Sequence, residues 1–141
     1  MEFAYAEIEG EQGTHFRPCL PITFSFAGHT FRVGNALVDT GSDITILPLE
    51  VAHLLEVPLD DSETLRIGSA GGGMFVALPS REKVGYAIER KGFRPIRWEG
   101  RIYFAEREPT ILLGHLECLE KFDLTFYGPE RKMTVLPRFT I

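Results

Sequence analysis

The chain has 141 residues, of which 44% are hydrophobic and 25% charged, and its formal net charge is -5. This length has room for one domain with a hydrophobic core, so we expect a single domain over residues 1–141. The negative charge argues against a partner that is nucleic acid or an anionic membrane, whereas a polypeptide partner meets no such objection. No stretch has the apolar run of a signal peptide or a membrane span, and cytoplasm is therefore the expected compartment.

Most segments are short, rich in β-branched and aromatic residues, and separated by Gly or Pro, which predicts an all-β fold. The expected strands, in chain order, cover residues 3–8, 21–27, 30–38, 44–47, 64–67, 74–78, 84–90, 101–105, 124–127 and 133–136. Two short helices are expected from apolar residues at helical spacing, one after Pro48 as far as Leu55 and one from Gly114 to about Lys121. The basic stretch 90–97 is interrupted by Gly and Pro and indicates a solvated hairpin end.

The segment 36–43 reads Ala-Leu-Val-Asp-Thr-Gly-Ser-Asp and is the strongest chemical signal in the chain. Hydrolysis of a peptide without a metal or a covalent intermediate needs a general base for water and a general acid for the carbonyl oxygen, and two carboxylates that share one proton supply both. Two apolar residues bury the strand that leads to Asp39, Thr40 offers a hydroxyl to the turn, and Gly41 permits close backbone approach. Asp39, Thr40 and Gly41 are therefore the candidate catalytic residues.

This segment resembles the active-site loop of the retropepsin-like aspartic proteases, in which two apolar residues precede Asp-Thr-Gly. Three further features follow in the order of that family: a helix at 48–55, a glycine-rich segment at 67–75 where the family has its flap, and the run Thr-Ile-Leu-Leu-Gly at 110–114. This run resembles the family's apolar-apolar-Gly element, which implies that it packs beside the loop of Asp39. The resemblance covers nearly the whole chain from Arg17 to Leu136 and points to the non-viral, bacterial or cellular branch. It implies an all-β, closed-barrel acid protease fold with two short helices.

The resemblance also implies a homodimer, because the chain carries Asp-Thr-Gly once and an aspartic protease needs two such carboxylates. The expected activity is that of an aspartic endopeptidase on a polypeptide substrate, with no cofactor and no metal. The strand at 133–136 is the expected link between subunits, with 3–8 as an additional possibility. The expected substrate-binding residues are Asp43, Ser69, Ala70, Gly71, Gly72, Gly73, Met74, Ile111 and Leu112.

The sequence departs from the family at one position. The family has an Arg after the Gly of the late Ile-Leu-Leu-Gly element, paired with the carboxylate four residues past the catalytic one, and those positions are His115 and Asp43 here. A contact between His115 and Asp43 is the expected substitute. Arg17-Pro18 resembles a family element in which the Arg reaches across the dimer, although its separation from Asp39 is longer here.

Two other functions are compatible with the residues. A module that kept the fold and dimerises or binds peptides without cleaving them is the first, because a fold does not establish an activity. A metal hydrolase is the second, with His115 and Cys118 as two ligands and His53 or Cys19 as further ones. Cys19 and Cys118 are too few for a disulfide framework and are expected to be packed thiols.

Overall fold

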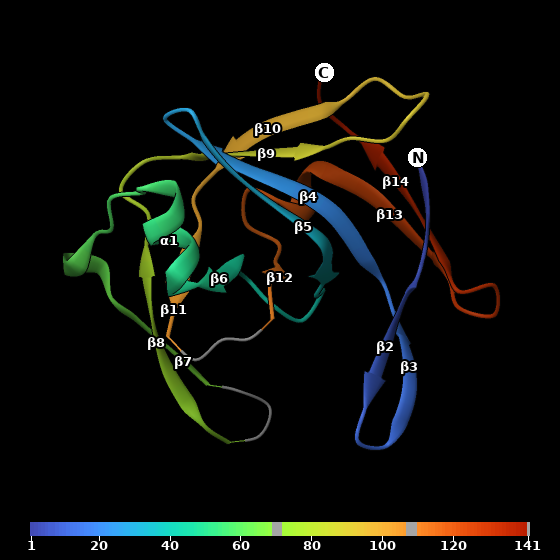
Figure 1. Ribbon diagram of the computed structural model, residues 1–141, viewed down its shortest axis with the longest axis horizontal. Helices are drawn as coiled ribbons and strands as arrows, with labels where there is room; N and C mark the ends of the chain where they lie inside the picture. Colours follow the sequence, from blue (N-terminus) through green and yellow to red (C-terminus); the bar gives the residue numbers. More distant parts are fainter. Residues whose placement is uncertain (69–71, 107–109, 141) are drawn as a thin grey trace.

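The computed structural model describes residues 1–68, 72–106 and 110–140, and this part of the chain is mostly β, as expected. Its main sheet curls into a half-barrel (Figure 1). The strand order across that sheet is β10-β9-β4-β5-β12-β6-β11-β8-β7. The strands are β4 (Cys19–Phe26), β5 (His29–Val38), β6 (Ile46–Pro48), β7 (Leu65–Gly68), β8 (Met74–Pro79), β9 (Val84–Ile88), β10 (Ile96–Gly100), β11 (Tyr103–Ala105) and β12 (Leu112–Leu113).

Two smaller sheets complete the described structure. One has the order β1-β14-β13 and joins β1 (Glu2–Ala4), β13 (Phe122–Tyr127) and β14 (Lys132–Pro137), and the other is the hairpin of β2 (Ala6–Gly10) and β3 (Gly13–Arg17). The chain termini lie close to the β1-β14-β13 sheet in Figure 1. Because the terminal strands form a sheet of their own, they do not connect β10 to β7, and the barrel that we expected to be closed is open.

The centre of the half-barrel is a crossing of three short strand ends. β12 pairs parallel with β5, with Leu113 opposite Val38, and antiparallel with β6, with Leu112 opposite Ile46. The late Ile-Leu-Leu-Gly element therefore packs beside the strand that ends at Asp39, as the sequence predicted. A parallel pair of this kind needs a long crossover connection, and the chain between β5 and β12 supplies it with α1 and other strands of the main sheet.

The long hairpin of β4 and β5 leads the chain into this crossing. Its tight turn is at Ala27 and Gly28, which both have positive φ, the conformation that a two-residue hairpin loop requires. The register shifts between Leu20 and Ile22, so Pro21, which has no N–H to donate, lies at an irregularity instead of in the regular ladder.

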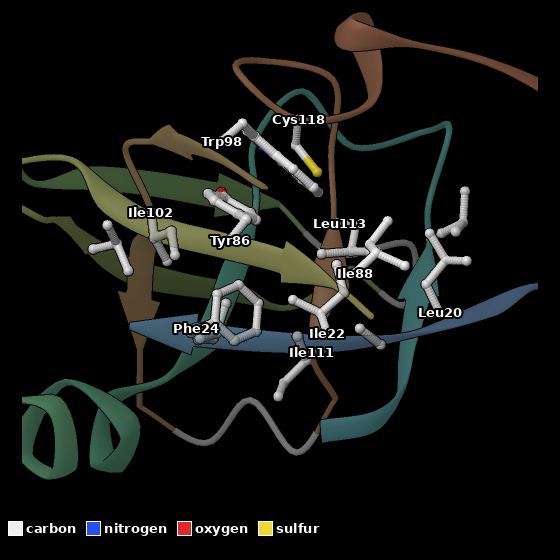
Figure 2. Packing of buried hydrophobic residues seen from close by; sticks show 14 of the residues in the cluster. Leu20, Ile22, Phe24, Tyr86, Ile88, Trp98, Ile102, Ile111, Leu113 and Cys118 are labelled. Atoms are coloured by element: carbon white, nitrogen blue, oxygen red, sulfur yellow. The ribbon is translucent and has the colours of Figure 1, made fainter. Parts of the chain in front are cut away.

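The main core contains side chains of the curled sheet, of α1, of the segment after β12 and of the terminal sheet. Figure 2 shows Phe24, Tyr86 and Trp98 packed in this interior, where the rings of Tyr86 and Trp98 stack with centroids 4.9 Å apart. Phe24 meets Tyr86 edge to face at 5.3 Å. Such aromatic pairs stabilise a fold beyond the area that they bury, so these rings tie β4, β9 and β10 together. A second, smaller cluster under the β7–β8 hairpin contains Ile44, Ile46, Ala77 and Ala105.

The first expected helix is confirmed as α1 (Leu49–Leu55), which begins after Pro48 and buries Val51, Ala52 and Leu55. The second is wrong: residues 115–118 form turns, and only one turn of 3-10 helix follows, η2 (Leu119–Lys121). Glu117 has a φ of +56°, which a right-handed helix does not allow. A third helical turn, η1 (Asp61–Glu63), was not expected.

The amino-terminal segment and the basic stretch differ from the sequence prediction. The expected strand 3–8 is broken at Tyr5 into β1 and β2, and β3 was not foreseen because its five residues are all exposed. The basic stretch does end a hairpin, but it runs directly into β10, where Ile96 and Trp98 are buried and Arg97 is exposed. None of the helices in the described part of the chain is long and apolar enough to cross a membrane.

Candidate active site

The candidate catalytic loop begins where β5 ends. The Asp39 side chain is partly buried, and its Oδ1 accepts a hydrogen bond of 3.0 Å from the backbone N–H of Gly41. The N–H of Ser42 donates to the Asp39 carbonyl at 3.1 Å, which closes a tight turn, and the Ser42 hydroxyl donates to the Ile44 carbonyl at 2.7 Å. The turn therefore fixes one carboxylate oxygen of Asp39 by a bond within the loop itself.

The segment after β12 holds this loop from the other side through backbone bonds. The Asp39 N–H donates to the Leu113 carbonyl at 3.0 Å, the His115 N–H to the Ser42 carbonyl at 3.0 Å, and the Leu116 N–H to the Asp43 carbonyl at 2.9 Å. These three bonds join two segments that lie far apart in the sequence. The loop is thus part of the folded core and not a free connection.

Gly114 makes this close approach possible. Its N–H donates to the buried Thr45 hydroxyl at 3.1 Å, and a Cβ atom built on it would overlap the backbone of Ile44. No other residue type fits without moving one of the two segments, because the obstructing atoms are backbone and not the end of a flexible side chain. The Gly of the late element is therefore a packing requirement of the candidate catalytic loop.

His115 contacts the loop in a different way from the expected one. Its Nε2 lies 2.7 Å from the Thr40 carbonyl oxygen, and since a carbonyl only accepts, this ring nitrogen carries the proton. The expected contact with Asp43 is not found: within the described residues no ion pair or side-chain hydrogen bond joins these two. His115 instead clamps the loop by its main chain at Ser42 and by its ring at Thr40.

A groove of about 680 Å³ opens over Asp39. Its floor is the catalytic loop with Asp39, Gly41 and Asp43, and Leu112 of β12 lies beside them. The opposite wall is the antiparallel hairpin of β7 and β8, in which Ile67 pairs with Phe75. This hairpin projects from the body of the molecule at the lower left of Figure 1. The groove is lined by Asp39, Gly41, Ser42, Asp43, Ile44, Ile46, Leu65, Arg66, Ile67, Gly68, Phe75 and Leu112.

The structure brings together some of the residues that the sequence singled out and separates others. Asp39, Gly41, Asp43 and Leu112 share the groove, and Thr40 is exposed next to them. Ile111 does not line it, because its side chain is buried in the main core while its carbonyl accepts from the Leu37 N–H at 2.9 Å. Gly72 and Gly73 are exposed at the start of β8, and Ser69, Ala70 and Gly71 lie outside the described residues.

Met74 is also absent from the groove lining. It is 68% exposed and lines a separate hollow of about 390 Å³ with Val76 and Leu78. These three residues alternate along β8, so they lie on one face, and the side chains between them lie on the other. Met74 therefore belongs to the outer face of the hairpin, whereas Phe75 lines the groove and also borders the separate hollow.

Sequence reasoning missed the apolar wall of the groove. Ile44 and Ile46 were assigned to a buried strand, and Ile67 and Phe75 to flap strands, without a role in the site. Ile44 and Ile46 are two residues apart in the chain, and Ile67 and Phe75 are paired across β7 and β8. The two members of each pair therefore lie on one face. That alternation was a signal that could have identified them before the structure was known.

The thiol of Cys118 is buried behind the loop and does not line the groove. Burial raises the pKa of the Cys118 thiol to about 12, and its side chain also interacts with the Thr45 hydroxyl. Burial is likewise the main cause that raises the pKa of the Cys19 thiol. Both cysteines are free and buried. Within the described ranges no three His, Cys, Asp or Glu side chains are grouped so that they could hold a metal ion.

Comparison of the sequence with protein-family models found no match, and comparison with curated proteins found none either.

Proposed function

We propose that this chain is one subunit of a homodimeric aspartic endopeptidase of the retropepsin-like family, in which the Asp39 carboxylates of two copies activate a water molecule. The observation that carries the proposal is the setting of Asp39. Its carboxylate is held by the Gly41 N–H at 3.0 Å, at the floor of a groove whose opposite wall is the β7–β8 hairpin. A rigid carboxylate at the base of a peptide-sized groove is what this chemistry needs.

The reaction follows from pairing two such carboxylates. Like charges a few ångströms apart do not both ionise, so one Asp39 is ionised while its mate keeps a proton. The ionised one accepts a proton from water as the oxygen attacks the peptide carbonyl, and the protonated one donates to the carbonyl oxygen. The carboxyl that took the proton from water then donates it to the amide nitrogen as the C–N bond breaks, while its mate takes a proton back from a hydroxyl of the tetrahedral intermediate, so the dyad again holds one proton. The chain supplies one Asp-Thr-Gly, so the second carboxylate comes from a second copy.

The groove lining favours an extended polypeptide with apolar side chains near the scissile bond. Ile67, Phe75 and Leu112 present partly exposed hydrocarbon surface near Asp39, whereas Ile44 and Ile46 border the groove but are themselves buried. Burial of an apolar substrate side chain there contributes on the order of 1.5–3 kcal/mol. An extended strand in the groove would also offer its backbone to the β7–β8 hairpin on one side and the loop on the other.

Several features of the fold support the proposal. These are the crossing of β5, β12 and β6 beside Asp39, the helix α1 directly after β6, and the hairpin over the groove. Pro18 of the Arg17-Pro18 element lies beside the same strand, because the Val38 N–H donates to its carbonyl at 2.9 Å. The longer sequence separation is taken up by the extended β4–β5 hairpin, so Pro18 still lies beside the catalytic strand.

The proposal is tested by cleavage of a diverse peptide library between about pH 4 and pH 7. Wild type is compared with Asp39→Asn, and Asp61→Asn serves as the matched control because Asp61 is an exposed residue of η1 outside the groove. Sedimentation measures the dimer content of each. We expect cleavage by wild type and the control and none by a dimeric Asp39→Asn. A stable wild-type dimer that cleaves nothing would favour the silent peptide-binding module, and equal cleavage by Asp39→Asn would refute the mechanism.

A further inference from the structure

The hairpin of β2 and β3 stands apart from the other sheets. In the described structure its two strands pair with each other and with no third strand, and all five residues of β3 are exposed. The hairpin projects from the lower right of the molecule in Figure 1. An isolated two-stranded hairpin has little stability of its own in water, because it buries little apolar surface. It therefore depends on contacts beyond its own two strands.

One face of this hairpin is used within the chain. Arg131, in the turn between β13 and β14, places its guanidinium 3.8 Å from the centroid of the Phe16 ring, and its carbonyl accepts from the Tyr5 N–H at 2.8 Å. Glu7 pairs with Phe16 across the strands, and Thr14 lies two residues before Phe16, so both share the face of this ring. The Arg131 contacts hold the hairpin in one direction, and it is not a loose loop.

The opposite face has no such cover in the described part of the chain. Ile8 pairs there with His15, and Ala6 with Arg17. The His15 ring lies beside the tip of the hairpin, because a Cβ atom built on Gly10 would be 3.6 Å from it. Ile8 is only partly buried and packs against neither hydrophobic cluster. This face thus presents an aliphatic side chain flanked by basic ones, and we call it the free face.

The base of the hairpin is fixed next to the candidate catalytic residue. β3 ends at Arg17, the carbonyl of the following Pro18 accepts from the Val38 N–H at 2.9 Å, and Val38 directly precedes Asp39. In the proposed enzyme the two-fold axis passes between two Asp39 carboxylates a few ångströms apart. The base of the hairpin then lies on the order of 10 Å from this axis. Five-residue strands extend about 16 Å, which is farther than the axis.

The direction of the hairpin decides on which side of the axis it ends. Figure 1 shows the β2–β3 and β7–β8 hairpins projecting to the same side of the molecule, with the crossing of β5, β12 and β6 between them. The β7–β8 hairpin is the wall of the chain's own groove over Asp39. The β2–β3 hairpin therefore lies on the other side of Asp39, where the second copy has to be. Its length is sufficient to carry it across the axis.

We propose that the β2–β3 hairpin is an arm that crosses the two-fold axis and lies against the second copy, at the end of that copy's groove. This inference rests on the proposed function, since only a second copy completes that active site. Because the arm projects to the same side as the groove walls, its free face, with Ile8 and His15, contacts the part of a long peptide farthest from the scissile bond. Each end of the substrate is then held by both chains, and the enzyme selects long polypeptides over short peptides.

A charge on either face of the arm tests the contact between the two copies. Ile8→Lys alters the free face, and Thr14→Lys is the matched control on the face that Arg131 covers. We expect Ile8→Lys to lower the association constant of the dimer by about tenfold or more in sedimentation, because it removes a buried aliphatic side chain from the contact. Thr14→Lys should leave the constant within about twofold of wild type. Circular dichroism checks that both variants fold.

A shortened arm tests the contact with substrate. Replacement of residues 9–14 by Asn-Gly closes the hairpin with a two-residue loop directly after the pair of Ile8 and His15, so the strands can still pair. At equal dimer content we expect kcat/KM to fall about fivefold or more, through KM, on a peptide of about twelve residues, which spans about 40 Å. A peptide of about six residues, which spans about 20 Å, should be cleaved as by wild type.

The outcomes separate the arm from the proposed function. If neither Ile8→Lys nor the shortened arm changes dimerisation or the preference for long peptides, the arm is overturned, while cleavage that Asp39→Asn abolishes leaves the proposed function standing. Loss of long-peptide cleavage with an unchanged association constant in Ile8→Lys would also overturn the crossing, because the arm would then bind peptide without touching the second copy. A wild-type chain that is monomeric and cleaves through Asp39 would overturn both proposals.

Discussion

Replacement of Gly114 by Ala adds one carbon atom at the tightest backbone contact of the candidate catalytic loop. The new Cβ would overlap the carbonyl and the nitrogen of Ile44, which are backbone atoms and cannot rotate away. The chain at residue 114 must therefore move, and this weakens the bond from its N–H to the Thr45 hydroxyl, now 3.1 Å long. The adjoining bond from the Asp39 N–H to the Leu113 carbonyl is strained by the same shift.

The overlap with Ile44 and the weakened hydrogen bonds determine how much Gly114→Ala lowers the free energy of unfolding. Overpacking of a well-packed interior costs about 1–3 kcal/mol, and loss of a buried hydrogen bond costs about 1 kcal/mol more. We therefore expect Gly114→Ala to lower the free energy of unfolding by about 2–4 kcal/mol, a large part of the total for a domain of this size. Catalysis should fall as well if Asp39 is the base that activates water, because its main chain moves.

Urea unfolding followed by tryptophan fluorescence measures this change. Trp98 is the single tryptophan, is buried, and donates its indole N–H to the Glu117 carbonyl at 3.1 Å, so it reports on the segment next to Gly114. Gly34→Ala is the matched control, because Gly34 is exposed in β5 and a Cβ atom added there would meet nothing within 4 Å. A Gly114→Ala midpoint within error of the Gly34→Ala midpoint, at equal m-values, would refute the role of Gly114 as a packing requirement of the loop.

Two further predictions concern the side chains of His115 and Cys118. His115→Ala removes the ring donor to the Thr40 carbonyl and should lower the free energy of unfolding by about 1 kcal/mol. His115→Gln keeps a donor and should recover part of this loss. Equal unfolding free energies for both variants in urea would contradict a stabilising contact between the His115 ring and Thr40. The raised pKa of Cys118 makes stability depend on alkaline pH, because above its ordinary pKa of 9.0 the unfolded thiol loses its proton while the folded one keeps it up to about pH 12. The contribution of the protonated Cys118 thiol to the free energy of unfolding is fully present below about pH 9 and is lost as the pH rises from about 9 to about 12. Between pH 7 and pH 10 the unfolding free energy should fall by about 1.4 kcal/mol more in wild type than in Cys118→Ala, and parallel pH curves would show that the thiol is not buried as described.

The parts of the fold that follow from local patterns were predictable from the sequence. α1 follows from Pro48 and the apolar spacing behind it, and the turn at Ala27 and Gly28 follows from its residue types. The loop at Asp39 and its contact with the late Ile-Leu-Leu-Gly element were both expected, although the pairing of Leu113 with Val38 required the structure.

The errors arose where distant contacts override local preference. Helical spacing favours a helix from Gly114 to Lys121, yet the segment is bent at Glu117 because its carbonyl accepts from the Trp98 indole and its N–H donates to the Glu120 carboxylate at 2.7 Å. The His115 ring contacts Thr40, and nothing in the spacing along the chain distinguishes this from a contact with Asp43. Which strand of the terminal sheet lies inside, β13 or β14, is likewise a property of pairing that residue types do not reveal.

The way in which the loop is fixed explains why so short a motif carries the candidate site. Most bonds that hold it run between backbone groups, such as Ser42 and His115 or Leu37 and Ile111, and almost any side chain is compatible with them. Side-chain identity matters at a limited set of positions: the Asp39 carboxylate, the Ser42 and Thr45 hydroxyls, the His115 ring and the missing side chain of Gly114. The geometry of such a site is fixed precisely, although only a few positions require a particular residue type. In the proposed enzyme the specificity of the groove would depend on partly exposed side chains such as Ile67 and Phe75, and these can vary without disturbing the loop, since they take no part in its bonds.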